Sequence, residues 1–104
     1  MHFFIYILFS QSTNKYYVGH SEDPIRRLSE HNCGIHQKST TSGRPWELKA
    51  IFEVQGDRGQ ALKVEGFIKK QKSRKLIELL INPDFIIAGY LDQLVRVPHV
   101  PAAN

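Results

Sequence analysis

The 104-residue sequence is poor in cysteine: Cys33 stands alone, so the sequence offers no internal disulfide and no thiolate metal centre. That scarcity is typical of the reducing cytoplasm, where we expect this chain to act. No apolar run approaches the roughly 18 residues of a membrane span, and we expect no membrane partner. The apolar start over residues 1–10 lacks the basic segment of a signal peptide, and we interpret it as a strand. Internal repeats and low-complexity linkers are also absent, which argues against a repeat array or a disordered chain.

What the sequence does contain is the composition of a folded domain, with 41% hydrophobic and 23% charged residues. Its net charge of +4 is unevenly distributed. Between Arg58 and Lys75 there are seven basic residues and one acidic residue, which leaves the other 86 residues with a net charge of −2. Such a run suits contact with nucleic-acid phosphates, and a solvated helix face explains it equally well.

Apolar segments bounded by turn residues predict six regular elements. The predicted strands cover Phe3–Phe9, Lys15–His20 and Trp46–Val54. The predicted helices run from Pro24 to an end at Gly34, over 58–71 and over Arg74–Ile81, with Asp57 and Ser73 capping the last two. The order is β-β-α-β-α-α, and the first two strands suit an antiparallel hairpin, so the predicted fold class is α+β.

Beyond residue 81 the pattern weakens. Phe85–Val97 suits either a short helix or a strand, and Pro98–Asn104 suits a loose tail. We therefore predict a domain over 1–81 and a C-terminal extension of uncertain structure over 82–104.

Five short motifs then follow one another along the chain. They are Phe4-Ile5-Tyr6, Tyr17-Val18-Gly19, Asp23–Asn32, Arg44–Leu48 and Ala61–Lys70. In this order and spacing they resemble the GIY-YIG nuclease family, specifically its small single-domain bacterial members. The resemblance covers residues 3–81, with Phe4 in place of the family's first glycine and Val18 in place of its isoleucine.

The resemblance implies a three-stranded antiparallel sheet flanked by helices. It also implies an endonuclease that hydrolyses DNA phosphodiester bonds with one divalent ion, Mg²⁺ or Mn²⁺, and makes 1–81 the nuclease domain. The matching catalytic positions are Tyr6, Tyr17, Arg27, His31 and Glu65, with Glu65 as the metal ligand. The family's late asparagine has only Asn82 as a counterpart. A short domain has little room for base readout, so structure-directed cleavage in DNA repair or recombination is the expected role.

The chemistry of two of these residues can be argued from their side chains. Glu65 can hold Mg²⁺ through one carboxylate, because Mg²⁺ keeps several waters and takes other ligands from substrate phosphate. The alternative is an ion pair with Lys69, four residues along the helix. Arg27 offers a planar fork that matches two phosphate oxygens, and its alternative partner is Glu30 or Glu22. Gly66, beside Glu65, predicts close helix packing at this point.

The other three candidates have roles that depend on proton transfer. His31 lies four residues after Arg27, so it either orients that arginine, accepts a proton, or is an ordinary exposed helix histidine. A tyrosine base needs a lowered pKa or a partner that takes its proton. We expect Mg²⁺ and Arg27 to lower the pKa values of Tyr6 and Tyr17, and the alternative is that both fill the core.

DNA is the expected partner. Candidate contacts are Gly19, Arg26, Lys38, Lys69, Lys70, Lys72 and Arg74. A strand glycine at residue 19 lets substrate approach the backbone closely. Two other functions stay open: a non-catalytic nucleic-acid-binding module of the same fold, and a protein-interaction domain that forms a homodimer through Phe85–Val97.

Overall fold

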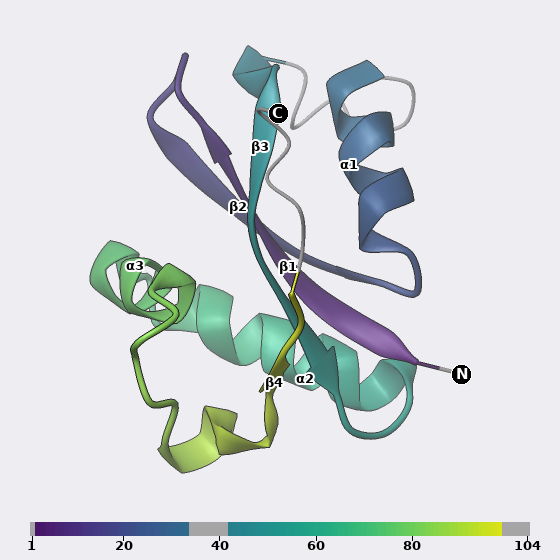
Figure 1. Cartoon of the computed structure of the whole chain (residues 1–104), viewed down its shortest axis with the longest axis vertical. Coiled ribbons are helices and arrows are strands. Elements are labelled where there is room, and N and C mark those ends of the chain that lie inside the picture. The colour runs from purple at the N-terminus through teal and green to yellow at the C-terminus, as the bar shows by residue number, and fades with distance from the viewer. Residues whose placement is uncertain (1, 34–41, 99–104) are drawn as a thin grey trace.

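The computed structural model describes residues 2–33 and 42–98 (Figure 1). Its elements are β1 (Phe3–Ser10), β2 (Lys15–Ser21), α1 (Pro24–Cys33), β3 (Trp46–Val54), α2 (Arg58–Lys70), α3 (Arg74–Ile81), the 3₁₀ helix η2 (Gly89–Gln93) and β4 (Val95–Arg96). The predicted helix end at Gly34, the candidate DNA contact Lys38 and most of the predicted tail lie outside the described residues. The fold is α+β, as predicted.

The sheet has four antiparallel strands in the order β2-β1-β3-β4, so the predicted count of three is wrong. The additional strand β4 pairs with β3 through two positions, Phe52 with Arg96 and Glu53 with Val95. A two-residue strand has no alternation that a sequence pattern can reveal. The predicted β-β-α-β-α-α order accordingly lacks the last two elements, η2 and β4.

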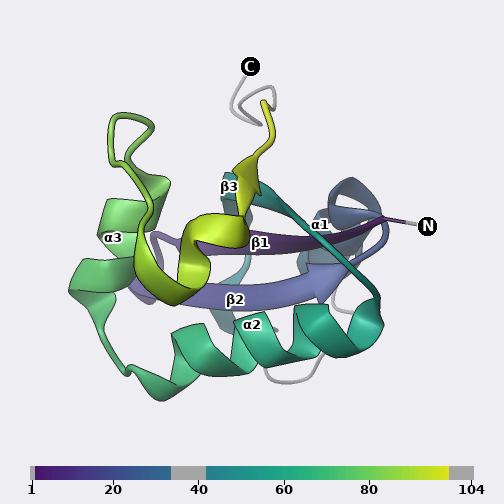
Figure 2. The ribbon, with the colours of Figure 1, turned by 90° about the horizontal axis from the view of Figure 1, so that it is seen from below.

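Helices cover the two faces of the sheet, with α1 on one and α2 and α3 on the other (Figures 1 and 2). Alternating residues of β1 serve these two faces. Ile5 and Ile7 belong to the larger core under α2 and α3, whereas Tyr6 and Leu8 belong to the smaller core under α1. Figure 2 shows α2 running along β2, the edge strand of the sheet.

The predicted helix caps of α2 and α3 are confirmed. The Asp57 side chain accepts a hydrogen bond from the Gln60 backbone N–H at 3.1 Å, and the Ser73 hydroxyl accepts one from Leu76 at 3.0 Å. Each cap satisfies a backbone donor that the first helical turn leaves without a partner. The Asp57 cap sets where α2 begins along β2, and the Ser73 cap sets where α3 begins.

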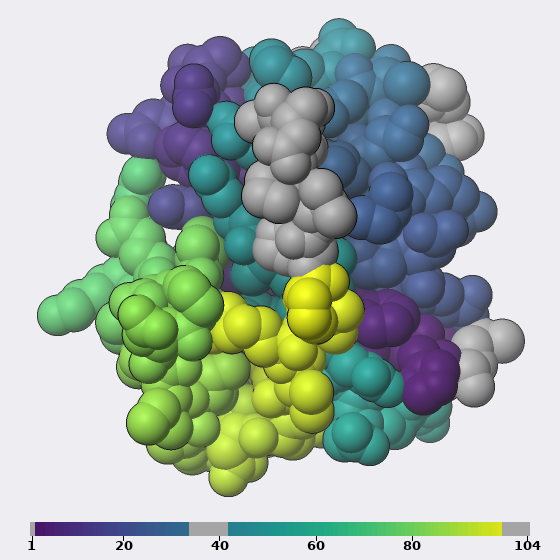
Figure 3. Space-filling model, in the orientation of Figure 1, coloured from purple at the N-terminus to yellow at the C-terminus, as the bar shows by residue number. Residues whose placement is uncertain are grey.

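The stretch after α3 packs on the chain's own core. Leu91 and Leu94 are buried in the larger core, and Figure 3 shows this yellow segment lying against the teal residues of β3. Arg96 donates to the carbonyls of Leu80 at 2.8 Å and Asn82 at 3.1 Å. The homodimer through this stretch stays a prediction. In the described part of the chain, no helix is long and apolar enough to cross a membrane.

Candidate active site

The site is built around the point where Tyr6 of β1 lies opposite Gly19 of β2. A Cβ atom at Gly19 would stand 2.6 Å from both Cζ and Oη of Tyr6, and 3.0 Å from Cε2 of Tyr17. The Tyr6 ring therefore occupies the space that a side chain at position 19 would fill. This arrangement carries a buried side chain of the central strand toward the edge of the sheet.

His31 is fully buried on α1 and contacts both tyrosines. Its Nε2 is hydrogen-bonded to the Tyr6 hydroxyl at 3.0 Å, and its ring meets the Tyr17 ring edge-on at 4.7 Å between centroids. The alternative that His31 is an ordinary exposed helix histidine is therefore wrong. The pKa of His31 is lowered to about 4, chiefly by burial and then by the charge of Arg27, while the charge of Glu30 opposes the shift.

Tyr6 differs from expectation in its ionisation. Its pKa is raised to about 12, first by burial and then by Tyr17. Arg27 does lower the pKa of Tyr6, as predicted, but burial outweighs it in the protein alone, and the charge of Glu65 adds to the rise. At neutral pH both Tyr6 and His31 are consequently uncharged.

Arg27 lies one helical turn before His31, in the first half of α1. Its Nη1 donates to Glu30 Oε1 at 2.6 Å, so the alternative pairing with Glu30 is present in the structure. Partial burial alone would lower the pKa of Arg27, but the bond to Glu30 and the neighbouring Tyr6 raise it overall. The guanidinium thus stays charged beside the Tyr6 hydroxyl.

Glu65 reaches the same edge from the other face of the sheet, on α2. Its Oε1 is bonded to His20 Nδ1 at 2.6 Å, and its Oε2 accepts from Lys69 Nζ at 2.7 Å, so the alternative ion pair with Lys69 is also present. Lys69 in turn places its ammonium 5.6 Å from the centre of the Tyr17 ring. These contacts link α2 to the tyrosines around the edge of β2. We call Tyr6, Tyr17, Arg27, His31 and Glu65 the edge cluster.

His20 is the residue that sequence reasoning missed. It follows Gly19 directly, and strand alternation turns it to the face opposite Tyr17, where α2 packs. That alternation could have placed it under α2. Its partner Glu65 lies 45 residues further on, and no local pattern connects the two. Close packing at Gly66 is also wrong, because nothing lies within 4 Å of an added Cβ there.

The donor set of the edge cluster fits a single ion held mostly by water and phosphate. In residues 2–33 and 42–98 no group of three or more His, Cys, Asp or Glu side chains could hold a metal. Glu65 offers one carboxylate, 15% exposed, whose two oxygens each bond to one side chain. A carboxylate has about four lone-pair positions, so coordination capacity remains. Mg²⁺ accepts such a sparse protein contribution.

Four of the candidate DNA contacts, Arg26, Lys69, Lys72 and Arg74, line two pockets, and Gly19 lines neither. The first pocket has a volume of about 410 Å³ and lies between β2 and the turn joining α2 to α3. Its cationic residues are Lys15, Lys69, Lys72 and Arg74. The second pocket has a volume of about 250 Å³ and is lined by His20, Ser21, Glu22, Arg26, Arg27 and Arg58. Lys70 is exposed on α2 and lines neither pocket.

Fold and site together define a small α+β domain with a cluster of tyrosine, histidine, arginine and glutamate at one sheet edge. A family model described as the GIY-YIG catalytic domain matches residues 2–78. The chain belongs to the GIY-YIG family, as the sequence motifs predict.

Similar proteins include both short and long chains. A UPF0213 protein of Listeria monocytogenes serotype 4b is 47% identical over 82 residues, covering 78% of this chain and 88% of the relative. Structure-specific endonuclease subunit SLX1 of Meyerozyma guilliermondii is 37% identical over 76 residues, covering 68% of this chain and 26% of the relative. The solution structure of UPF0213 protein BH0048 from Bacillus halodurans is 26% identical, with a TM-score of 0.48, covering 89% of this chain and 93% of that one.

Proposed function

We propose that this protein is a metal-dependent endonuclease that hydrolyses DNA phosphodiester bonds. The observation that carries the proposal is the edge cluster, in which Glu65 approaches Tyr17 through Lys69 while His31 bonds Tyr6. Membership of the GIY-YIG catalytic domain family supports it. So does the similarity to proteins named structure-specific endonuclease subunits, of which this chain spans about a quarter or less.

Each residue of the cluster has a task in this proposal. Arg27 binds two oxygens of the reacting phosphate, and its permanent charge stabilises the charge that develops there. Glu65, oriented by His20, holds Mg²⁺ or Mn²⁺ through a carboxylate oxygen. When bound, the ion stabilises the transferring phosphoryl group and the leaving oxygen. Tyr17, half-buried beside Lys69, faces the substrate.

Tyr6 and His31 form the proton-accepting pair in the proposed reaction. A phenol whose pKa is about 12 does not ionise by itself near neutral pH. His31 stays neutral because its pKa is about 4, and with its proton on Nδ1 it can accept the Tyr6 proton at Nε2. The hydroxyl can then take a proton from the attacking water as it gives up its own. No independent tyrosinate is required.

The substrate is DNA in a non-uniform structure, such as a flap or a branch, and the setting is DNA repair or recombination. The SLX1 relatives, named structure-specific endonuclease subunits, support structure-directed cleavage. A free, exposed Cys33 suits a reducing cytoplasm.

The test is cleavage of duplex, single-stranded, flap and branched DNA in Mg²⁺ or Mn²⁺ by wild-type protein and by Glu65→Gln. We expect the wild type to cut at least one substrate. The variant should lose activity by about 100-fold or more, which is the usual effect of removing one group that stabilises transition-state charge. Glu47→Gln is a matched control, because Glu47 also pairs with a lysine, Lys49, at 3.5 Å, and lies on β3, which contributes no residue to the cluster. Equal loss in both variants would contradict the role of Glu65.

A second candidate, nucleic-acid binding without cleavage, has one observation in its favour. Both carboxylate oxygens of Glu65 already bond to His20 and Lys69, so an ion must share them. This candidate predicts salt-sensitive DNA binding by the wild type and no metal-dependent product with any substrate of the panel.

A further inference from the structure

The two pockets lie at opposite ends of the edge strand β2, with Glu65 between them. Oε1 of Glu65 bonds to His20, which lines the second pocket, and Oε2 bonds to Lys69, which lines the first. Strand β2 itself begins at Lys15 in the first pocket and ends at Ser21 in the second. At about 3.3 Å per residue it spans roughly 20 Å.

Both pockets are cationic. The first has three lysines and one arginine and no acidic residue in its lining. The second has three arginines and a histidine against one carboxylate, that of Glu22. Arg26 and Arg27 of the second pocket both lie near one carboxylate, that of Glu30, at 3.7 and 2.6 Å, so one of their two charges remains and Arg58 adds another. A ligand for both pockets must therefore be an extended polyanion.

We propose that one nucleic-acid strand runs along the outer edge of β2, with phosphates in both pockets and the reacting phosphate between them at Glu65. This inference rests on the proposed function and adds the strand's path to it. Along the axis of a B-form duplex each strand carries one charge per roughly 3.4 Å, so a strand that spans both pockets presents several phosphates to this edge. A mononucleotide or a free phosphate could fill only one pocket.

Lys72 and Arg58 place their charge at the two ends of this path, and neither is the residue type that its backbone position favours. Lys72 has a φ of 48° directly after the C-cap of α2, where glycine is the favoured residue. Arg58 opens α2, where a positive charge opposes the helix dipole, and its guanidinium lies 5.4 Å from the centre of the Phe3 ring. Backbone and helix preferences therefore do not explain either residue.

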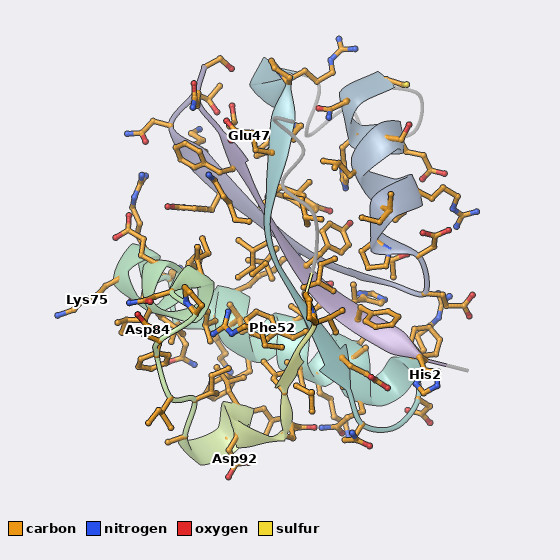
Figure 4. The ribbon with its side chains drawn as sticks, in the orientation of Figure 1. His2, Glu47, Phe52, Lys75, Asp84 and Asp92 are labelled. Atoms are coloured by element: carbon orange, nitrogen blue, oxygen red, sulfur yellow. The ribbon has the colours of Figure 1, made fainter. Side chains whose placement is uncertain are left out.

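The first test measures binding of a fluorescent DNA strand in the absence of divalent metal across a series of salt concentrations. Arg58→Ala and Lys72→Gly are each expected to weaken binding several-fold and to reduce the slope of log K against log salt by about one, and the double variant by about two. Lys75→Ala is the control. It removes the same charge from α3, where Lys75 points away from the molecule (Figure 4), and is expected to leave the slope unchanged.

A second test locates each pocket along the strand. Neutral methylphosphonate linkages are placed on one side of the cleaved bond or on the other. Linkages on one side should weaken binding by the wild type but leave binding by Arg58→Ala unchanged. Linkages on the opposite side should weaken binding by the wild type but leave binding by Lys72→Gly unchanged. If both variants respond to the same side, or if Lys75→Ala behaves like them, the path is wrong.

Folding and catalysis are kept separate in these tests. Lys72→Gly relieves a left-handed backbone, so its unfolding temperature should equal or exceed that of the wild type. Wild-type protein that binds with the expected slopes but cuts no DNA would overturn the proposed nuclease and support the path. Cleavage by the wild type with no change of slope in either variant would overturn the path and leave the nuclease standing.

Discussion

Tyr6 belongs to the core and to the candidate site at once. It is 1% exposed on the central strand β1, yet its hydroxyl lies over Gly19 at the edge strand and bonds to His31. A residue so placed cannot shift without disturbing both the packing under α1 and the proton-accepting pair.

Gly19→Ala is expected to lower both stability and activity. The new Cβ would meet Tyr6 at 2.6 Å, and a buried ring cannot withdraw as a flexible side chain could. We expect a loss of about 1–3 kcal/mol in the free energy of unfolding, together with a loss of DNA cleavage. Denaturant unfolding and cleavage assays on the same preparations measure the two effects.

The control is Gly66→Ala, in the middle of α2 and directly after Glu65. Its Cβ meets nothing within 4 Å, so alanine should stabilise the helix by about 0.5–1 kcal/mol and keep cleavage. A Gly19→Ala protein as stable and active as Gly66→Ala would contradict the proposed geometry.

Buried His31 makes stability depend on pH. Its folded pKa of about 4 lies below the ordinary value of 6.5, so the unfolded chain binds more protons between these values. Stability from His31 is therefore present above about pH 6.5 and is lost as pH falls toward 4, by up to about 3 kcal/mol. Denaturant titrations of wild type and His31→Gln over this range measure it. The difference between the two proteins should shrink at acid pH, and a constant difference would contradict the assignment.

Local spacing predicted the ion pairs of the site and missed its long-range bonds. The pairing of Glu65 with Lys69 and that of Arg27 with Glu30 follow from positions three or four apart on one helix. The bonds from Tyr6 to His31 and from His20 to Glu65 join residues 25 and 45 apart. Those depend on how α1 and α2 pack on opposite faces of the sheet, which side-chain spacing does not encode.

At the scale of elements, the turn of the β1–β2 hairpin is hydrogen-bonded to α3. Asn14 takes the left-handed conformation there, with a φ of 56°. Arg74 donates to the backbone oxygen and to Oδ1 of Asn14, each at 2.8 Å, and its guanidinium lies 5.0 Å from the centre of the Tyr16 ring. Arg74 therefore has a structural role beside its predicted contact with DNA.

Substituting Arg74 separates these two roles. Arg74→Lys keeps the charge and loses the planar fork, so it should lower the free energy of unfolding by about 0.5–1 kcal/mol while the salt dependence of DNA binding stays unchanged. Arg74→Ala should lose the same stability and, if the residue also contacts phosphate, reduce the salt slope by about one. Thermal unfolding and anisotropy titrations read the two effects. Equal stability of Arg74→Lys and wild type would show that the hydrogen bonds from Arg74 to Asn14 contribute nothing to the free energy of unfolding.

The sequence predicted element boundaries correctly where an apolar run is bounded by capping or turn residues. Trp46–Val54 and Arg74–Ile81 have the predicted bounds, the helix with a serine cap before it and a proline two residues beyond its end. The short strand β4 had no such signals, because its two residues gain their place from Phe52 and Glu53 of β3. Pairing of this kind is set by the tertiary fold.

For the whole molecule, the segment after α3 completes the larger core. Leu91 and Leu94 are 5% and 6% exposed in a core that also holds residues of β1, β3 and α2. The guanidinium of Arg96 lies 5.0 Å from the centre of the Phe52 ring, near the middle of the molecule (Figure 4). The larger core therefore contains residues from both 1–81 and 82–98.

Leu94→Ala tests the contribution of this segment. We expect a loss of about 2–4 kcal/mol in the free energy of unfolding, because a buried leucine leaves a cavity in the core. The neighbouring Val95 is 50% exposed, so Val95→Ala should cost well under 1 kcal/mol. Denaturant midpoints of the two variants provide the comparison. Similar losses from both would mean that residues 82–98 are an appendage and that 1–81 is the folding unit.

The open edge of β2 has a consequence for solubility. Within the described residues no strand pairs with its outer side, and such an edge is a template for strands of other chains. Lys15 and Lys69 stand along this edge, and like charges on a second copy repel it. The cations that would serve a substrate thus also act as gatekeepers against aggregation. Removing Lys15 or Lys69, or screening them with concentrated salt, weakens DNA binding and this protection together, so variants of these two lysines that bind DNA poorly should also self-associate.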